Sequence, residues 1–243
     1  MPAVAFVLLE RAIDPDADAL VRAASVFGYT LVHEPGSTGP CTFSIAGGGH
    51  LMIMLIPAPH PDAAEMPPAL VGPSAEDLQR MQGHYVIALM GAPDRPRHED
   101  TMLAQLTAAT VHASPAIAAM LGHGVCFHRA EFFVKIVESE PAELPVMVCV
   151  DITRAAEPRE RISFLTHGMV RYGREEFFVT ASQRGRGALD FLTGLMNWML
   201  FDPNKQLPTG DTVGRTADER VLVQRVASPL GEGPEVIRLD LDL

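Results

Sequence analysis

Residues 162–201 read ISFLTHGMVRYGREEFFVTASQRGRGALDFLTGLMNWMLF, two apolar segments around a glycine turn followed by one apolar helix. We predict strands over 162–171 and 175–181, joined at Gly173, because glycine suits a tight hairpin turn. Apolar side chains recur at helical spacing within 188–201; they are Leu192, Leu195, Met196 and Met199. A hairpin followed by a single helix favours an α+β fold over the strand–helix alternation of a parallel sheet.

The rest of the chain repeats this mixture of hairpins and single helices. Strands over 42–46 and 50–56 flank the glycines at 47–49, which predicts a second hairpin. The stretch 57–73 contains six prolines and cannot form a helix interior or a central strand, so we expect a surface crossover there. We therefore expect an α+β protein with mixed or antiparallel sheets, helices packed on one face, and two related lobes, residues 1–73 and 74–243.

Several shorter elements within the second lobe are predicted from local patterns. We expect a helix over 98–112 that Pro115 interrupts, followed by a further helical turn as far as Leu121. Apolar runs predict strands over 125–127 and 145–151.

Composition and charge restrict the classes of partner. The 243 residues are 47% hydrophobic and 20% charged, as in ordinary globular proteins. A net charge of −11 repels nucleic acid and anionic membranes, so we expect neither as a partner. The same charge attracts basic proteins, so a basic protein is a possible partner. Solubility alone is the alternative explanation of this charge. Three cysteines fit a reducing compartment, which predicts a cytoplasmic protein.

A candidate metal site lies in the middle of the chain, at His123, Cys126, His128 and Glu131. On a strand, Cys126 and His128 point to the same face, and Glu131 begins the next helix. Zinc accepts thiolate, imidazole and carboxylate ligands, so the residue types fit, although the spacing matches no established zinc pattern. The alternative is a structural cysteine beside a surface histidine.

Candidate ligand-binding residues lie near the C-terminus, at His167, Glu175 and Asp211. His167 and Glu175 come from the two strands of one predicted hairpin, which makes their proximity plausible. Asp211 stands in a glycine-flanked turn, where aspartate also serves the backbone. The chain shows no phosphate-binding loop and no nucleophile elbow, so we expect no cofactor and favour a non-enzymatic protein.

The same C-terminal region carries a family resemblance over residues 162–243. The matching features are Thr166, Gly168, the run 172–176, the apolar helix over 192–200 and the turn 210–214. With these features the segment resembles a bacterial family of unknown function, named domain of unknown function 4261. The resemblance implies no activity, substrate or catalytic residue.

Three function classes stay open at this point. The first is a non-enzymatic cytoplasmic interaction protein of bacteria, such as an immunity or accessory protein of a toxin or secretion system. The second is an enzyme or a small-ligand or metal-binding protein with a site near His123, Cys126 and His128. The third is a module that self-associates through a sheet edge or through the helix that carries Trp198. The sequence leaves the oligomeric state undetermined.

Overall fold

The computed structural model describes residues 3–34, 36, 39–91, 95–139, 141–157, 161–182, 187–216, 218–231 and 233–241. The chain divides into two compact units, which we call unit 1 (Met1–Cys149) and unit 2 (Val150–Leu243). Helices and mainly antiparallel sheets occur in both, which confirms the α+β class. The boundary that we expected after residue 73 lies inside unit 1.

Unit 1 is built on a seven-stranded sheet in the order β2-β3-β4-β5-β1-β6-β7, in which every pairing is antiparallel. The strands are β1 (Ala3–Leu9), β2 (Leu31–Glu34), β3 (Cys41–Ile45), β4 (His50–Ile56), β5 (Gly83–Met90), β6 (Ala116–Leu121) and β7 (His128–Arg129). The expected glycine hairpin joins β3 to β4. Gly49 has a φ of +96°, and a Cβ there would lie 2.8 Å from the carbonyl oxygen of Met90, so only glycine fits.

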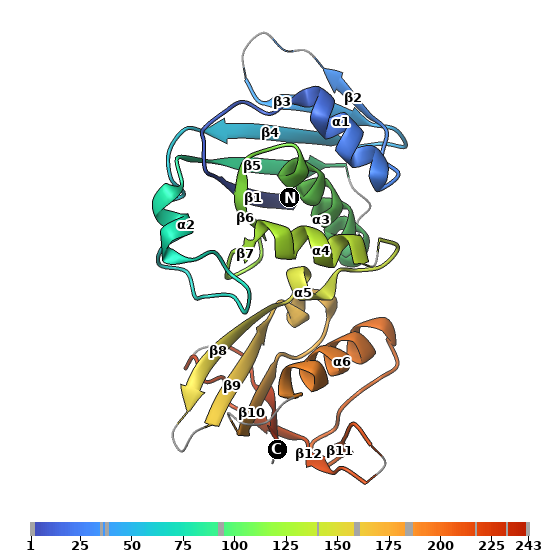
Figure 1. The fold of residues 1–243 in the computed structure, drawn as a ribbon. Coiled ribbons are helices and arrows are strands. Elements are labelled where there is room, and N and C mark those ends of the chain that lie inside the picture. The colour runs from blue at the N-terminus through green and yellow to red at the C-terminus, as the bar shows by residue number, and fades with distance from the viewer. Residues whose placement is uncertain are drawn as a thin grey trace. The chain divides into compact units, whose positions relative to one another are not determined.

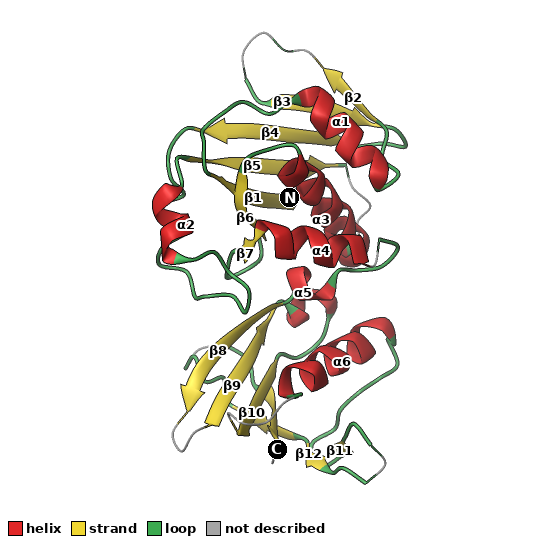
Figure 2. Ribbon diagram, in the orientation of Figure 1, coloured by secondary structure: helices red, strands yellow, loops and turns green. Residues whose placement is uncertain are grey.

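Helices cover one face of this sheet (Figures 1 and 2). They are α1 (Ala17–Val26), α3 (Pro96–His112) and α4 (Ala130–Ser139). Helix α3 packs on β1 and β6 and also contacts α1 and α4. The short helix α5 (Val146–Cys149) contacts α3, α4 and β6, so it ends unit 1 against this helical layer.

The proline-rich stretch, which we call segment 57–73, packs on side chains of β1 that alternate with those facing the helices. Phe6 and Leu8 point to one side of β1, and Ala5 and Val7 point to the other. A buried apolar cluster forms around Leu8; its members are Leu8, Ala63, Met81, Ala118, Met120 and Phe127, with Phe6, Met66, Leu78 and Ile117 packed against it. The helix α2 (Ala75–Arg80) follows, and a reciprocal capping box between Ser74 and Asp77 starts it.

Unit 2 holds a five-stranded sheet in the order β13-β14-β10-β9-β8 and a separate two-stranded ribbon, β11-β12. The strands are β8 (Asp151–Glu157), β9 (Arg161–His167), β10 (Phe177–Ser182), β11 (Thr212–Val213), β12 (Val221–Leu222), β13 (Gln224–Val226) and β14 (Val236–Leu241). The β10–β14 pair is parallel and the others are antiparallel, so the sheet is mixed. Helix α6 (Ala188–Phe201) contacts β10, and a 3-10 helix (Met169–Tyr172) separates β9 from β10.

Four short stretches differ from the sequence-based expectation. The strand expected over 162–171 ends at His167, and the 3-10 helix Met169–Tyr172 stands before β10, so β9 and β10 are not joined by a tight turn at Gly173. Residues Ala116–Leu121 form strand β6 beside β1 instead of a helical turn, and residues Val146–Cys149 form a helical turn instead of a strand. The strand expected over 125–127 begins at His128. Short apolar runs fit a buried strand and a buried helix equally well, so tertiary pairing decides between them. Among the helices of the described residues, none combines the length and apolarity needed to cross a membrane.

Candidate functional site

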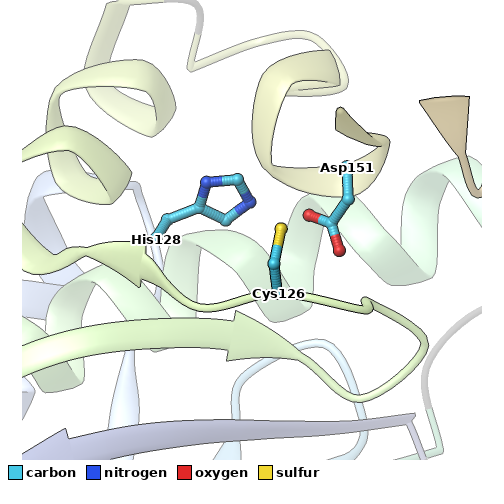
Figure 3. Close-up of side chains that lie close together, drawn as sticks. All are labelled: Cys126, His128 and Asp151. Atoms are coloured by element: carbon cyan, nitrogen blue, oxygen red, sulfur yellow. The ribbon is translucent and has the colours of Figure 1, made fainter. Parts of the chain in front are cut away.

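A thiol, an imidazole and a carboxylate lie together in the middle of the chain. The Cys126 sulfur, a ring nitrogen of His128 and a carboxylate oxygen of Asp151 all lie within 4.8 Å of one another. Figure 3 shows the thiol pointing between the imidazole and the carboxylate. The exposed fractions of these residues are 0%, 4% and 2%. We call these three residues the Cys126 cluster.

Packing of the intervening residue accounts for the common side of Cys126 and His128. They flank Phe127, whose side chain is 3% exposed and belongs to the apolar cluster around Leu8. Of the three residues only His128 lies on strand β7, and Cys126 stands in a bend. Phe127 is buried in the apolar cluster, while the ligand atoms of its two neighbours lie within 4.8 Å of each other elsewhere. His128 is held there by strand pairing with Ala119 and by its ring, which lies 5.7 Å from that of Phe132.

The carboxylate comes from the segment that follows unit 1. Asp151 is separated from the last residue of α5 by Val150 alone, and Val150 is fully buried. Sequence analysis did not select Asp151. The signal that could have found it is a single acidic residue at the end of the apolar run 145–150, where a buried carboxylate requires a partner.

The other members of the predicted metal site lie apart from this cluster. His123 donates from Nε2 to the carbonyl oxygen of Cys149 at 3.2 Å, and its Nδ1 lies 3.9 Å from the buried carboxylate of Asp100. Glu131 stands in the first turn of α4 and is exposed beside a hollow of about 690 Å³. Within the part of the chain that the structure describes, the clustered ligand atoms include neither His123 nor Glu131.

The candidate ligand residues of the C-terminal region each have a partner of their own. His167 Nε2 lies 2.8 Å from the hydroxyl of Thr153, and Glu175 binds the guanidinium of Arg225 through two contacts of 2.8 and 2.7 Å. Asp211 is exposed, and its backbone carbonyl accepts a hydrogen bond from the amide of Val223.

His167 is the one of these three that lies next to a member of the Cys126 cluster. It is paired with Asp151 across the β8–β9 ladder. Burial lowers the pKa of His167 and is the largest influence on it, whereas the negative charges of Glu176 and Asp151 raise that pKa. A neutral imidazole is therefore favoured beside the carboxylate of Asp151.

Two kinds of chemistry use a thiol, an imidazole and a carboxylate. A cysteine nucleophile with a histidine base uses these groups, but its sulfur must touch a substrate. Cys126 has no exposed surface, which is unfavourable for such an attack. A metal ion is small, and zinc binds these three donor types directly. The burial of the cluster therefore favours metal binding over nucleophilic catalysis.

Comparisons with protein-family models, with curated proteins and with solved structures found no match for this chain. The resemblance of residues 162–243 to the family named domain of unknown function 4261 stays a prediction.

Proposed function

We propose that this protein binds a divalent transition-metal ion of the zinc type through Cys126, His128 and Asp151. The observation that carries the proposal is the convergence of three different ligand atoms within 4.8 Å. Zinc–ligand bonds of about 2.0–2.3 Å place tetrahedral ligands roughly 3.5 Å from one another. Because no two of the ligand atoms are more than 4.8 Å apart, each pair would have to approach by at most roughly 1.3 Å to reach that value.

Charge balance supports the same ion. A buried carboxylate and a buried thiolate are costly alone, because burial in a low-dielectric interior disfavours isolated charges. A divalent cation compensates one thiolate and one carboxylate, while neutral imidazole adds a ligand without charge. Three protein ligands leave a fourth coordination position for a small ligand such as a water molecule.

The test is metal analysis of untagged protein. The chain is loaded with Zn²⁺, dialysed and measured by mass spectrometry of the metal. We expect about one equivalent in the wild type and its loss in Cys126→Ser, His128→Gln and Asp151→Asn, because each change removes one ligand. Cys41→Ser and His98→Gln serve as matched controls, since Cys41 lies on β3 and His98 is exposed on α3.

A second readout separates ligation from general damage to the fold. Co²⁺ bound to a thiolate gives a charge-transfer absorption that requires the sulfur, so Cys126→Ser abolishes the band while the circular dichroism spectrum is retained. Stoichiometric metal that persists in Cys126→Ser, or wild-type protein that retains no Zn²⁺ after loading, contradicts the proposal.

A second candidate function is a cytoplasmic interaction protein, and one surface of unit 2 favours it. Trp198 and Phe201 on α6 are 41% and 38% exposed, and Leu222 on β12 is 48% exposed. A hollow of about 630 Å³ opens between α6 and residues 212–215. Aromatic side chains on a surface are typical of interfaces, and the net charge of −11 selects a basic protein as the occupant. An immunity or accessory protein of a bacterial toxin or secretion system fits this description.

Co-purification at physiological salt, followed by cross-linking, tests this second function. We expect a basic protein to cross-link to α6 and to be lost in Trp198→Asp. Val26→Asp is the matched control, because Val26 is 74% exposed on α1 of unit 1. Recovery of the chain alone, or a partner that Trp198→Asp retains, contradicts the interaction. A monomer by light scattering excludes self-association.

A further inference from the structure

Segment 57–73 is seated on unit 1 through a histidine that lies among three other aromatic rings. The ring of His60 lies 5.1 Å from Phe6 of β1, 5.0 Å from His84 of β5 and 5.3 Å from Phe127. His60 and His84 are 9% and 6% exposed. Two titratable rings are therefore buried against each other where the segment meets the sheet.

Hydrogen bonds assign the protons on these two rings. His84 Nδ1 lies 2.9 Å from the carbonyl oxygen of Ala58, and a carbonyl only accepts, so this nitrogen carries a proton. His60 Nδ1 accepts from the backbone N–H of Asp62 at 3.3 Å, so it carries none. Protonation of His60 would place a proton on the one ring atom that must accept, and that hydrogen bond would be lost.

The surroundings of His60 also oppose its charged form. Burial is the largest cause that lowers the pKa of His60, and the neighbouring His84 lowers it further. Asp62, on the same segment, raises it, and the two other facing rings, Phe6 and Phe127, are uncharged. A pKa below the ordinary 6.5 means that the detached segment takes up the proton more readily. Attachment is thus strongest above pH 6.5 and weakens as the pH falls below it.

The segment depends on the contacts of the His60 ring because its backbone forms few hydrogen bonds to the rest of unit 1. Its six prolines lack an N–H donor. The backbone is anchored by a hydrogen bond from the Arg129 amide to the Val71 carbonyl at 2.9 Å and by a β-bridge at Ala69, both near the end of the segment. The earlier part is held by the contact of His84 with Ala58 and by the packing of Ala63 and Met66, and a charged His60 disrupts this part.

We propose that the His60–His84 pair is an acid-sensitive latch, in which protonation of His60 releases segment 57–73 from the sheet of unit 1. Release uncovers the apolar side chains that the segment covers, chiefly Leu8 and Phe127. The latch stands on contacts within unit 1 and does not depend on metal binding.

Hydrogen exchange measured between pH 7.5 and pH 5.5 tests the latch. After correction for intrinsic exchange, we expect the protection of the segment 57–73 amides to fall on acidification, by at most about tenfold per pH unit for one proton. In His60→Phe the ring remains but cannot be charged, so protection stays constant. His98→Gln, at an exposed position on α3, behaves as the wild type.

A second variant covers the possibility that His60→Phe does not fold. His84→Asn keeps a donor for the Ala58 carbonyl but removes the imidazole that lowers the pKa of His60, so the loss of protection becomes shallower than in the wild type. Equal protection of the segment 57–73 amides at pH 7.5 and pH 5.5 in the wild type contradicts the latch. A His60→Phe or His84→Asn variant whose protection falls as much as that of the wild type also contradicts it.

Discussion

Tyr29 and Tyr85 show how single side chains join distant parts of unit 1. The Tyr29 hydroxyl donates to Gln105 Oε1 at 2.6 Å, and the Tyr85 hydroxyl donates to the carbonyl oxygen of Ile13 at 2.8 Å. Burial raises the pKa of each tyrosine to about 12, and Asp14 and Cys41 add to the effect at Tyr85. Because the neutral phenols are favoured, their contribution to stability is complete below pH 10 and is lost between pH 10 and about 12.

An absorbance titration of tyrosinate measures this directly. We expect two phenols to ionise near pH 12, together with alkaline unfolding. Tyr85→Phe removes one late ionisation and leaves the Ile13 carbonyl without its donor, which costs about 1 kcal/mol. Ionisation of all tyrosines near pH 10 in folded protein is the contrary result.

At the same scale, the sequence predicted the pair within the site but not its third member. Two residues of separation on extended backbone predicted that Cys126 and His128 share a side, and the structure brings them together. Asp151 stands 25 positions after Cys126, so its place depends on the turn of α5, a stretch whose apolar sequence predicts a strand. The alternative of a surface histidine beside a structural cysteine is wrong for His128, which is buried, and its burial depends on tertiary contacts.

At the scale of one element, a glycine inside α6 and the glycine that caps its N-terminus give opposite predictions. Gly194 lies in the helix interior, where an added Cβ meets nothing within 4 Å, so Gly194→Ala should stabilise unit 2 by about 0.5–1 kcal/mol. Gly187 caps the helix at a φ of +103°, where a Cβ costs about 1–2 kcal/mol, so Gly187→Ala should destabilise it. Urea unfolding followed by tryptophan fluorescence compares the pair. A loss of stability in Gly194→Ala would contradict the prediction, because it would show that the added methyl group does not fit beside the helix.

Long, periodic elements were predictable and short apolar ones were not. The helices α3 and α6 are long enough to repeat the helical spacing of apolar residues over several turns. The β3–β4 hairpin is marked by two apolar runs around its glycines. In contrast, β6 spans six residues that are apolar throughout, and its strand form follows from its position against β1, which only the complete sheet provides. Prolines marked segment 57–73 as irregular, yet they carry no information on whether such a segment separates two cores or covers one.

At the scale of the whole molecule, the division into two compact units predicts that they respond separately to a local defect. Glu176 in unit 2 accepts hydrogen bonds from Thr166 Oγ1 at 2.6 Å, from the Gly168 amide at 2.8 Å and from the Val170 amide at 3.4 Å. Glu176→Ala leaves these donors without their acceptor and should destabilise unit 2 by about 1–3 kcal/mol.

The two units can be followed independently in one experiment. The single tryptophan of the chain reports on unit 2, and hydrogen exchange of β1 and β5 reports on unit 1. We expect Glu176→Ala to lower the denaturation midpoint seen by fluorescence and to leave the exchange of β1 and β5 unchanged. Glu131→Gln, an exposed change in unit 1, should alter neither. Equal shifts in both signals would mean that the chain unfolds as one cooperative body.

The alternation at residues 126–128 has a mechanical consequence. Phe127 is wedged into the apolar layer, while the residues on either side of it reach the opposite way. The short backbone of these three residues therefore joins two separately packed groups of side chains. Because a dense interior yields little, a shift of Cys126 and His128 is expected to disturb the packing around Phe127.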